Sequence, residues 1–285
     1  MQPTTTSIRN PQFQHGFTLV EISIVLVILG LVAGGIFAGQ SLLHSYELRS
    51  IVNEKEKYVA MVNSYTTRYN AYPGDHATAT DNWGISTACS GADTSMSATC
   101  SGNGNGVYEK YDVSGDAINE TLLAWQHLSN AGLVDGTYSG LNDGLTQIVG
   151  QNVPEGKIGS ARWLFGTYGQ LVYFSSGSDW SYVGMSSRTL EYSGEPDSDG
   201  INPIISAADT LGIDIKIDDG KPLKGILRVN LFGNPNCTDA SILGTPGTAF
   251  YEISVATAMV SGDADYVVNA DMDQAVCTPI FYNAF

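Results

Sequence analysis

Histidine is scarce in this 285-residue chain, and its placement leaves little material for a catalytic centre. The histidines are His15, His44, His76 and His127, and the first two flank a strongly apolar segment. A Ser-His-Asp triad or a zinc centre needs several chemically active groups in one folded site. No G-x-S-x-G motif and no P-loop occurs, and the Gly-rich run 102–106 lacks the spacing and the following helix of a phosphate loop. We therefore expect a flexible turn at 102–106 and no enzymatic activity.

Two turns that combine aspartate with glycine offer the oxygen ligands that calcium prefers. They are residues 197–200 (DSDG) and 218–220 (DDG). The first turn begins like an EF-hand loop but lacks the distal glutamate of that motif. Such turns are common for conformational reasons alone, so solvated acidic side chains are the favoured interpretation. A calcium site at Asp197 and Asp199 is the alternative.

The four cysteines are Cys89, Cys100, Cys237 and Cys277. Their spacing is far from that of a zinc site, which usually needs two close pairs of Cys or His. Two disulfides are expected if the chain is exported to an oxidising compartment. Pairing of neighbours, Cys89 with Cys100 and Cys237 with Cys277, is the simplest connectivity, and a crossed pairing stays open.

Acidic residues dominate the charge of the chain. Asp and Glu total 29 against 13 Lys and Arg, which gives a net charge of −16 and a pI near 4.3. Nucleic acid is therefore an unfavourable partner, because affinity for its phosphate backbone comes mainly from Lys and Arg. Hydrophobic residues make up 43% of the chain, which is enough for a sizeable core in one or two folded units.

A strongly apolar segment lies near the N-terminus. Between Ile22 and Ala38 only Ser23 is polar. A helix over residues 17–40 would be about 36 Å long, against about 30 Å for the hydrocarbon core of a bilayer. A soluble core helix is disfavoured because it rarely lacks a polar face over such a length. A cleaved secretory signal is disfavoured by Glu21, since an acid in a membrane segment is costly and usually functional.

Residues 16–21 (GFTLVE), followed by this apolar segment, resemble the N-terminus of type IV prepilins and of type II secretion pseudopilins. The resemblance implies that a prepilin peptidase cuts after Gly16, on the cytoplasmic side, and methylates the new N-terminal amine of Phe17. Glu21 would then be the fifth residue of the mature chain. The chain departs from the family pattern at His15, where Lys or Arg is common.

Glu21 has two candidate roles. Phe17 and Glu21 are four residues apart, which places the new amine and the carboxylate on one face of a helix. In a bundle of staggered helices, Glu21 of one subunit would meet the Phe17 ammonium of its neighbour, and two poorly solvated charges would neutralise each other. The resemblance and the cost of burying the charge favour this pairing over a carboxylate solvated among lipid headgroups.

The apolar helix is expected to continue beyond the membrane to about Tyr72. Apolar residues recur at spacings of three and four over residues 48–69, with charged residues between them. Pro73 and Gly74 then end the helix and open a turn. This face of the helix needs a partner, which the rest of the chain must supply.

Residues 69–75 (YNAYPGD), with the following Trp83 and Gly84, also resemble the helix-to-head junction of pilins and pseudopilins. The stretch 87–106 is rich in Ser, Thr, Gly and Asn, which predicts a surface loop. The predicted organisation is a leader peptide (1–16), a transmembrane and assembly helix (17–72) and an extracytoplasmic globular head (73–285).

The head is expected to be α+β. Residues 116–131 predict a helix with Asp116 as its N-cap and Gly132 just past its end. Segments rich in Val, Ile and aromatic residues predict strands at 161–164, 170–174, 180–184, 225–231 and 250–256. Residues 211–217 alternate like a strand, whereas residues 206–209 resemble a helix start, so this segment stays open. The predicted fold is a long N-terminal helix packed against an antiparallel β-sheet.

The resemblance implies a structural function. With its large head, the chain is similar to a minor pilin of a type IV pilus-like filament, and a type II secretion pseudopilin is the alternative. A signal-anchored periplasmic receptor or enzyme is the alternative from another class. The implied partners are other pilin subunits, the prepilin peptidase and an inner-membrane assembly platform. The subunit would cross the inner membrane once and then join a periplasmic or extracellular filament. Some pseudopilins bind calcium in the head, which keeps the calcium alternative at Asp197 and Asp199 open.

Overall fold

A computed structural model of the chain describes residues 18–86, 98–108, 119–140, 147–158, 160–173, 180–194, 202–222, 224–229, 237–238, 265–268, 274–282 and 284–285. Residues 167–173 and 180–187 are described by their backbone alone. The chain divides into two compact units, Met1–Tyr46 and Glu47–Phe285, and the division falls inside the first helix, α1 (Leu19–Tyr69). The predicted boundaries of leader, assembly helix and head stay predictions.

In the first unit, α1 is apolar on all sides. The large hydrophobic side chains between Leu19 and Tyr46 are all exposed. A window of 18 residues in this helix has a mean hydropathy of 2.6 and buries none of its residues. The helix is therefore long enough and apolar enough to cross a membrane. The predicted N-terminal apolar helix is confirmed.

In the second unit, α1 buries a single stripe. Its buried residues are Leu48, Ile51, Tyr58, Val62 and Tyr65. They follow the three- and four-residue spacing that brings side chains to one face of a helix. The helix ends at Tyr69, slightly before the predicted end, because Asn70 takes a left-handed conformation with φ of 51°. Asparagine tolerates this conformation better than most residues, so it can end a helix before the proline is reached.

The second unit contains a four-stranded antiparallel sheet in the order β1-β2-β4-β3. The strands are β1 (Arg162–Tyr173), β2 (Trp180–Ser193), β3 (Leu227–Val229) and β4 (Pro279–Tyr282). The prediction of separate strands at 161–164 and 170–174 was wrong, because β1 runs through both. Its glycines form no turn, and the register shifts between Tyr168 and Gln170, as in a β-bulge. The predicted strand at 250–256 lies outside the described residues. The α+β class is confirmed.

Three shorter helices complete the second unit: α2 (Ala79–Trp83), α3 (Glu120–Asn130) and α4 (Ala207–Ile217). The prediction of Asp116 as the N-cap of α3 was wrong, because the Asn119 side chain accepts two N–H groups of the first turn. Asparagine caps a helix as well as aspartate does, and Asn119 directly precedes the buried residues of α3. The open segment 206–217 is a helix whose N-cap is Ser206.

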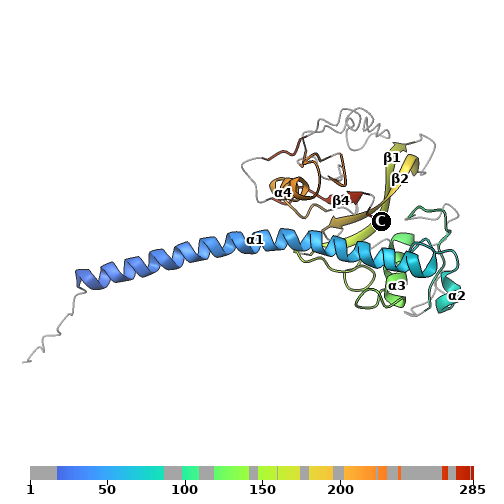
Figure 1. Cartoon of the computed structure of the whole chain (residues 1–285), viewed down its shortest axis with the longest axis horizontal. Helices are drawn as coiled ribbons and strands as arrows, with labels where there is room; N and C mark the ends of the chain where they lie inside the picture. Colours follow the sequence, from blue (N-terminus) through green and yellow to red (C-terminus); the bar gives the residue numbers. More distant parts are fainter. Residues whose placement is uncertain are drawn as a thin grey trace, which may run out of the picture. The chain divides into compact units, whose positions relative to one another are not determined.

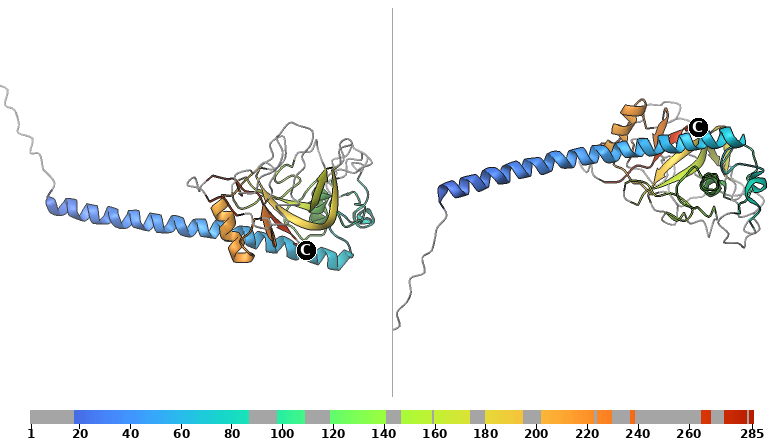
Figure 2. Two further views of the ribbon diagram at one scale, coloured as in Figure 1. Left: turned by 90° about the horizontal axis from the view of Figure 1, so that it is seen from above. Right: turned by 60° about the horizontal axis from the view of Figure 1, so that its bottom comes forward.

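An aromatic cluster forms the main core, where α1, α3 and β1 pack together (Figures 1 and 2). The Tyr58 ring of α1 lies edge-on to Trp125 of α3 and to Trp163 of β1, with ring centroids 4.9 and 5.6 Å apart. Trp125 also contacts Phe165, at 4.5 Å between centroids. Each such pair stabilises a fold by about 0.5 to 1.5 kcal/mol beyond the burial of its surface. This part of α1 is therefore an integral element of the core.

A second, smaller core lies beside α4. Its buried residues are Ala207, Val229, Cys237, Tyr266 and Cys277. It contains the Cys237–Cys277 disulfide, whose Cα atoms are 5.1 Å apart and whose cysteines are 40 residues apart in the chain. Closing such a loop stabilises a fold by about 4 kcal/mol in the chain-entropy model, which matters where few residues are buried. The pairing of Cys89 with Cys100 stays a prediction, because Cys89 lies outside the described residues.

Candidate functional site

The N-terminus of α1 is closed by reciprocal hydrogen bonds between Thr18 and Glu21. The Thr18 N–H and hydroxyl donate to Glu21 Oε2 at 2.7 and 2.8 Å, and the Glu21 N–H donates to Thr18 Oγ1 at 3.2 Å. This is a capping box, which satisfies N–H groups that the first turn of a helix leaves open. The sequence interpretation treated Glu21 as a charge alone. The T-x-x-E spacing before an apolar run is the signal that would have revealed the cap.

His127 joins three segments at the end of α1. Its Nδ1 accepts the Gly74 N–H at 2.8 Å, so the ring carries its proton on Nε2. That nitrogen lies 3.0 Å from both the Cys100 carbonyl oxygen and the Thr99 hydroxyl. Burial lowers the pKa of His127 to about 3. The neutral ring therefore ties α3 to the turn after α1 and to the segment that contains Cys100.

The Gly-rich run 102–106 binds two carboxylates of the protein itself. The Gly106 N–H donates to Asp75 Oδ2 at 2.7 Å, and the Asn103 N–H donates to Glu120 Oε1 at 2.9 Å. Both acidic residues are buried. The run is a turn, as predicted, but it is a structural one that links the end of α1 to the start of α3. This role could not be predicted from the sequence, because Asp75 and Glu120 are distant from the run along the chain.

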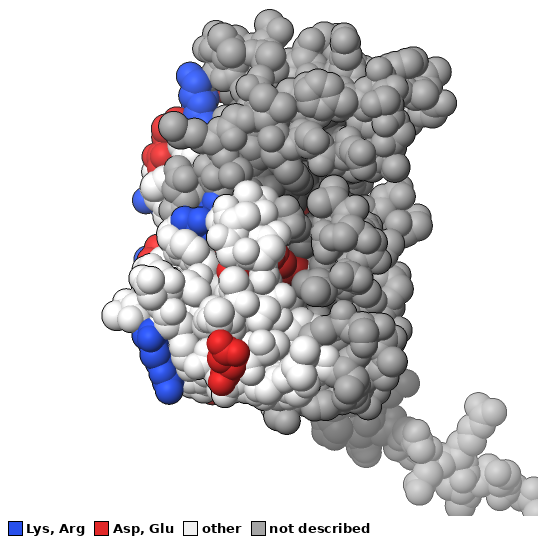
Figure 3. All heavy atoms as spheres, turned by 90° about the vertical axis from the view of Figure 1, so that its right-hand side faces the viewer, with Lys and Arg blue, Asp and Glu red and all other residues white. Residues whose placement is uncertain are grey.

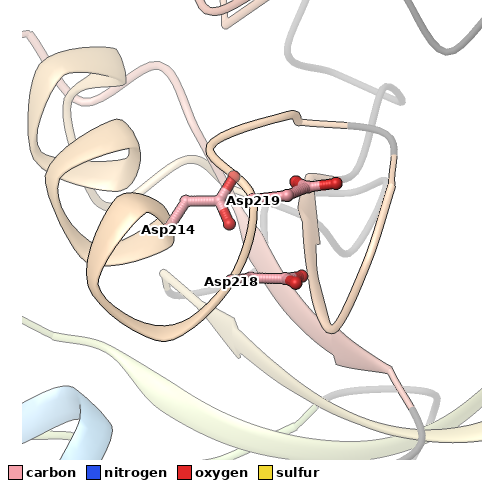
Figure 4. A group of neighbouring side chains, drawn as sticks. All are labelled: Asp214, Asp218 and Asp219. Atoms are coloured by element: carbon pink, nitrogen blue, oxygen red, sulfur yellow. The ribbon is translucent and has the colours of Figure 1, made fainter.

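Three aspartates from α4 and the turn after it form an acidic cluster (Figure 4). Carboxylate oxygens of Asp214, Asp218 and Asp219 all lie within 4.8 Å of one another. Asp214 is fully buried and points from α4 toward the turn, and its Oδ2 accepts the hydroxyl of Tyr266 at 2.9 Å. Burial, reinforced by the neighbouring acids, raises the pKa of Asp214 to about 6. Within the described residues, this cluster has the composition and spacing to hold a metal ion.

The sequence identified only part of this cluster. Asp218 and Asp219 belong to one of the two acidic turns, whereas Asp214 was missed because its segment read equally as a strand. On a helix, Asp214 and Asp218 share a face through their spacing of four, and that spacing is the signal for the pair. Asp197 and Asp199, the predicted calcium ligands, lie outside the described residues.

On the face of the protein that Figure 3 shows, the described surface is mostly uncharged. The Lys and Arg side chains of the described residues there are scattered and interspersed with Asp and Glu, and they form no basic patch. Phosphate-backbone binding relies on clustered Lys and Arg, and the described part of this face shows no such cluster.

Residues 12–37 match the family model of the prokaryotic N-terminal methylation motif. This chain carries a prepilin-type signal. Such a signal marks type IV pilins and pseudopilins, a family of structural proteins, so the resemblance found in the sequence is confirmed. No curated protein and no solved structure matches the chain.

The prepilin-type signal spans Gly16, Phe17 and Glu21 and extends into the apolar part of α1. Together with that helix it fits a protein anchored in the inner membrane. Gly16 and Phe17 lie outside the described residues, so the cleavage and methylation sites rest on the sequence. The structure adds that Glu21, inside the signal, already has hydrogen-bond partners in its own chain.

Gly102→Ala is expected to destabilise the second unit by about 1 to 3 kcal/mol, because the added Cβ would collide with the Gly74 carbonyl oxygen and the Asp75 Cα. Gly212→Ala is the matched control, since a Cβ at this helical position meets nothing. It should instead stabilise by about 0.5 to 1 kcal/mol. Urea unfolding of the detergent-solubilised chain, followed by tryptophan fluorescence, measures both. Equal stability of Gly102→Ala and wild type would contradict the close packing of this turn.

His127→Gln is expected to weaken the dependence of stability on pH. The folded pKa of about 3 lies below the ordinary value near 6.5, so the unfolded chain takes up the proton first. This residue therefore lowers stability as the pH falls below about 6.5, by on the order of 2 kcal/mol at pH 5. The variant should be less stable than wild type at pH 7, because Gly74 loses its acceptor, yet lose less on acidification.

Unfolding free energies at pH 7 and pH 5 give this comparison. His44→Gln, an exposed position in the first unit, is the control and should behave like wild type. An identical loss of stability in His127→Gln and wild type would show that the His127 ring is not held neutral by burial.

Proposed function

We propose that this chain is a structural subunit, of the minor-pilin kind, in a type IV pilus-like filament. The observation that carries the proposal is the prepilin-type signal followed directly by a helix with an exposed apolar surface. In this proposal residues 1–16 are a leader that prepilin peptidase removes, residues 17–72 form the membrane and assembly helix, and residues 73–285 form the head. The mature chain begins at an N-methylated Phe17.

The exposed apolar surface of α1 supports this assembly route. Water-exposed side chains from Leu19 to Tyr46 would be strongly unfavourable, so they need lipid or other helices around them. Before assembly the inner membrane supplies that environment. In a filament, equivalent helices of other subunits replace the lipid, and an inner-membrane platform inserts one subunit after another. The finished filament is periplasmic or extracellular.

Glu21 is the proposed assembly residue. In the single chain its carboxylate accepts hydrogen bonds from Thr18 but meets no positive charge among the described residues. The Phe17 ammonium of a staggered neighbour would supply that charge. The pair would neutralise itself in a surrounding of low polarity, where an isolated charge is costly. The capping box and this pair use the same carboxylate, but the cap needs only an oxygen acceptor whereas the pair needs a negative charge. A substitution that keeps the oxygen and removes the charge therefore separates the two roles.

A type II secretion pseudopilin is the second candidate, because the same signal marks that class. The alternative from another class is a periplasmic receptor or enzyme that uses α1 only as a membrane tether. We infer a structural role for this chain rather than a catalytic one. Mass spectrometry of the N-terminus separates these classes. An N-methylated Phe17 supports the pilin class, and a retained Met1 supports the tether. Surface fibres that contain the protein, with secretion unaffected by its deletion, then favour a pilus over a secretion pseudopilus.

Gly16→Ala is expected to block maturation, because the peptidase must accept a residue without a side chain at the cut. The variant should stay in the inner membrane at full length, which immunoblotting and mass spectrometry of membrane fractions detect. Gly30→Ala is the control, since this helical glycine has nothing within reach of an added Cβ in the single chain. Processing of Gly16→Ala at the wild-type rate would remove the cleavage assignment.

Glu21→Val and Glu21→Gln are both expected to reduce filament incorporation by roughly tenfold or more while leaving membrane insertion intact. Glutamine keeps the oxygen that caps the helix but removes the charge, so it isolates the contribution of charge pairing. The ratio of sheared filament to membrane-bound protein measures incorporation. If Glu21→Gln assembled like wild type while Glu21→Val did not, the cap rather than the charge would be the assembly feature.

A further inference from the structure

The acidic cluster of Asp214, Asp218 and Asp219 brings three carboxylates close together. Their oxygens lie within 4.8 Å of one another, and in the part of the chain that the structure describes none of the three forms an ion pair. Nearby Lys221 pairs instead with Asp265. Like charges at this distance repel one another, so the arrangement is unfavourable unless something neutralises it.

The orientation of Asp214 points to a ligand. The residue is fully buried, and its Oδ2 accepts the Tyr266 hydroxyl. The Gly220 N–H also interacts with this carboxylate, but Oδ1 is buried and has no hydrogen-bond partner of good geometry among the described residues. The side chain points from α4 toward Asp218 and Asp219 (Figure 4). A buried carboxylate oxygen without a well-aligned donor is unfavourable, because the contacts that replace its lost water are too weak. A cation between the three acids would provide the missing interaction.

The turn also holds its acids in place. Asp218 Oδ2 accepts the N–H groups of Ile226 and Leu227, and Asp219 Oδ1 accepts the N–H of Lys221 at 2.9 Å. Each of these carboxylates has a second oxygen for a further ligand. The site is therefore composed entirely of oxygen donors on a short segment, which suits a hard divalent cation and not zinc or copper.

We propose that Asp214, Asp218 and Asp219 bind a hard divalent cation, Ca²⁺ in preference to Mg²⁺. Calcium accepts irregular sets of six to eight oxygen ligands, whereas magnesium demands near-octahedral geometry and keeps most of its water. The cation links α4 to the turn that precedes β3. It thereby stabilises the smaller core, which also contains the Cys237–Cys277 disulfide.

The test is calcium binding by the full chain in detergent. After treatment with EDTA, CaCl₂ at about a hundredfold excess over Kd should raise Tm by roughly 5 to 10 °C. Asp219→Asn is the first variant, because Asp219 is exposed and asparagine keeps the oxygen that accepts the Lys221 N–H. It should lower the affinity measured by calorimetry at least about tenfold, since it removes a full charge. Asp135→Asn, at an exposed acid in the loop after α3, is the matched control and should bind like wild type.

Three results would overturn the proposal. The first is the absence of a calcium-induced rise in Tm for wild type, and the second is an equal rise for wild type and Asp219→Asn. The third is an equal response to MgCl₂, which would remove the assignment to calcium. Asp197→Asn distinguishes this cluster from the other acidic turn. Loss of calcium binding in Asp197→Asn but not in Asp219→Asn would place the ion at residues 197–199.

Discussion

The central constraint on this protein is that one continuous helix must suit two different surroundings. From Leu19 to Tyr46, α1 exposes large apolar side chains on every face. Beyond Glu47 the same helix buries only one stripe. An all-round apolar helix is stable only where water is absent, whereas a one-sided helix needs a folded partner on its apolar face and water on the other. The rest of the fold supplies that partner.

The partner is built from aromatic contacts and from short polar ties at the end of α1. Tyr58 packs on Trp125 and Trp163, so the helix belongs to the same core as α3 and β1. Near the last turn, the neutral ring of His127 accepts the Gly74 N–H, and the run 102–106 binds Asp75 and Glu120. These hydrogen bonds connect the turn after α1 to α3 and to the run 102–106, so they fix the path of the chain as it leaves α1.

Features governed by local patterns could be predicted from the sequence. The apolar helix, its buried stripe, α3 and the prepilin-type signal all follow from spacing or composition within a short window. Features that depend on distant partners could not. Glycines that read as a turn continue β1 through a bulge, β4 is too short to stand out, and Asp214 joins its cluster only if residues 207–217 are helical. The capping box of Thr18 and Glu21 was visible in the sequence, but the unusual charge at this position obscured it.

The capping box changes what an intersubunit contact at Glu21 can contribute. In the single chain this carboxylate already accepts the Thr18 N–H and hydroxyl, so a neighbour's amine would meet a group that is partly satisfied. Assembly would therefore gain only the difference between the new contact and whatever it displaces, which is smaller than the strength of an isolated ion pair. That difference depends on charge, because hydroxyl and amide donors leave the carboxylate its full negative charge. In the proposed filament, a neighbour's amine at Glu21 would therefore contribute mainly through the charge of the carboxylate, because the cap already supplies hydrogen bonds to Oε2.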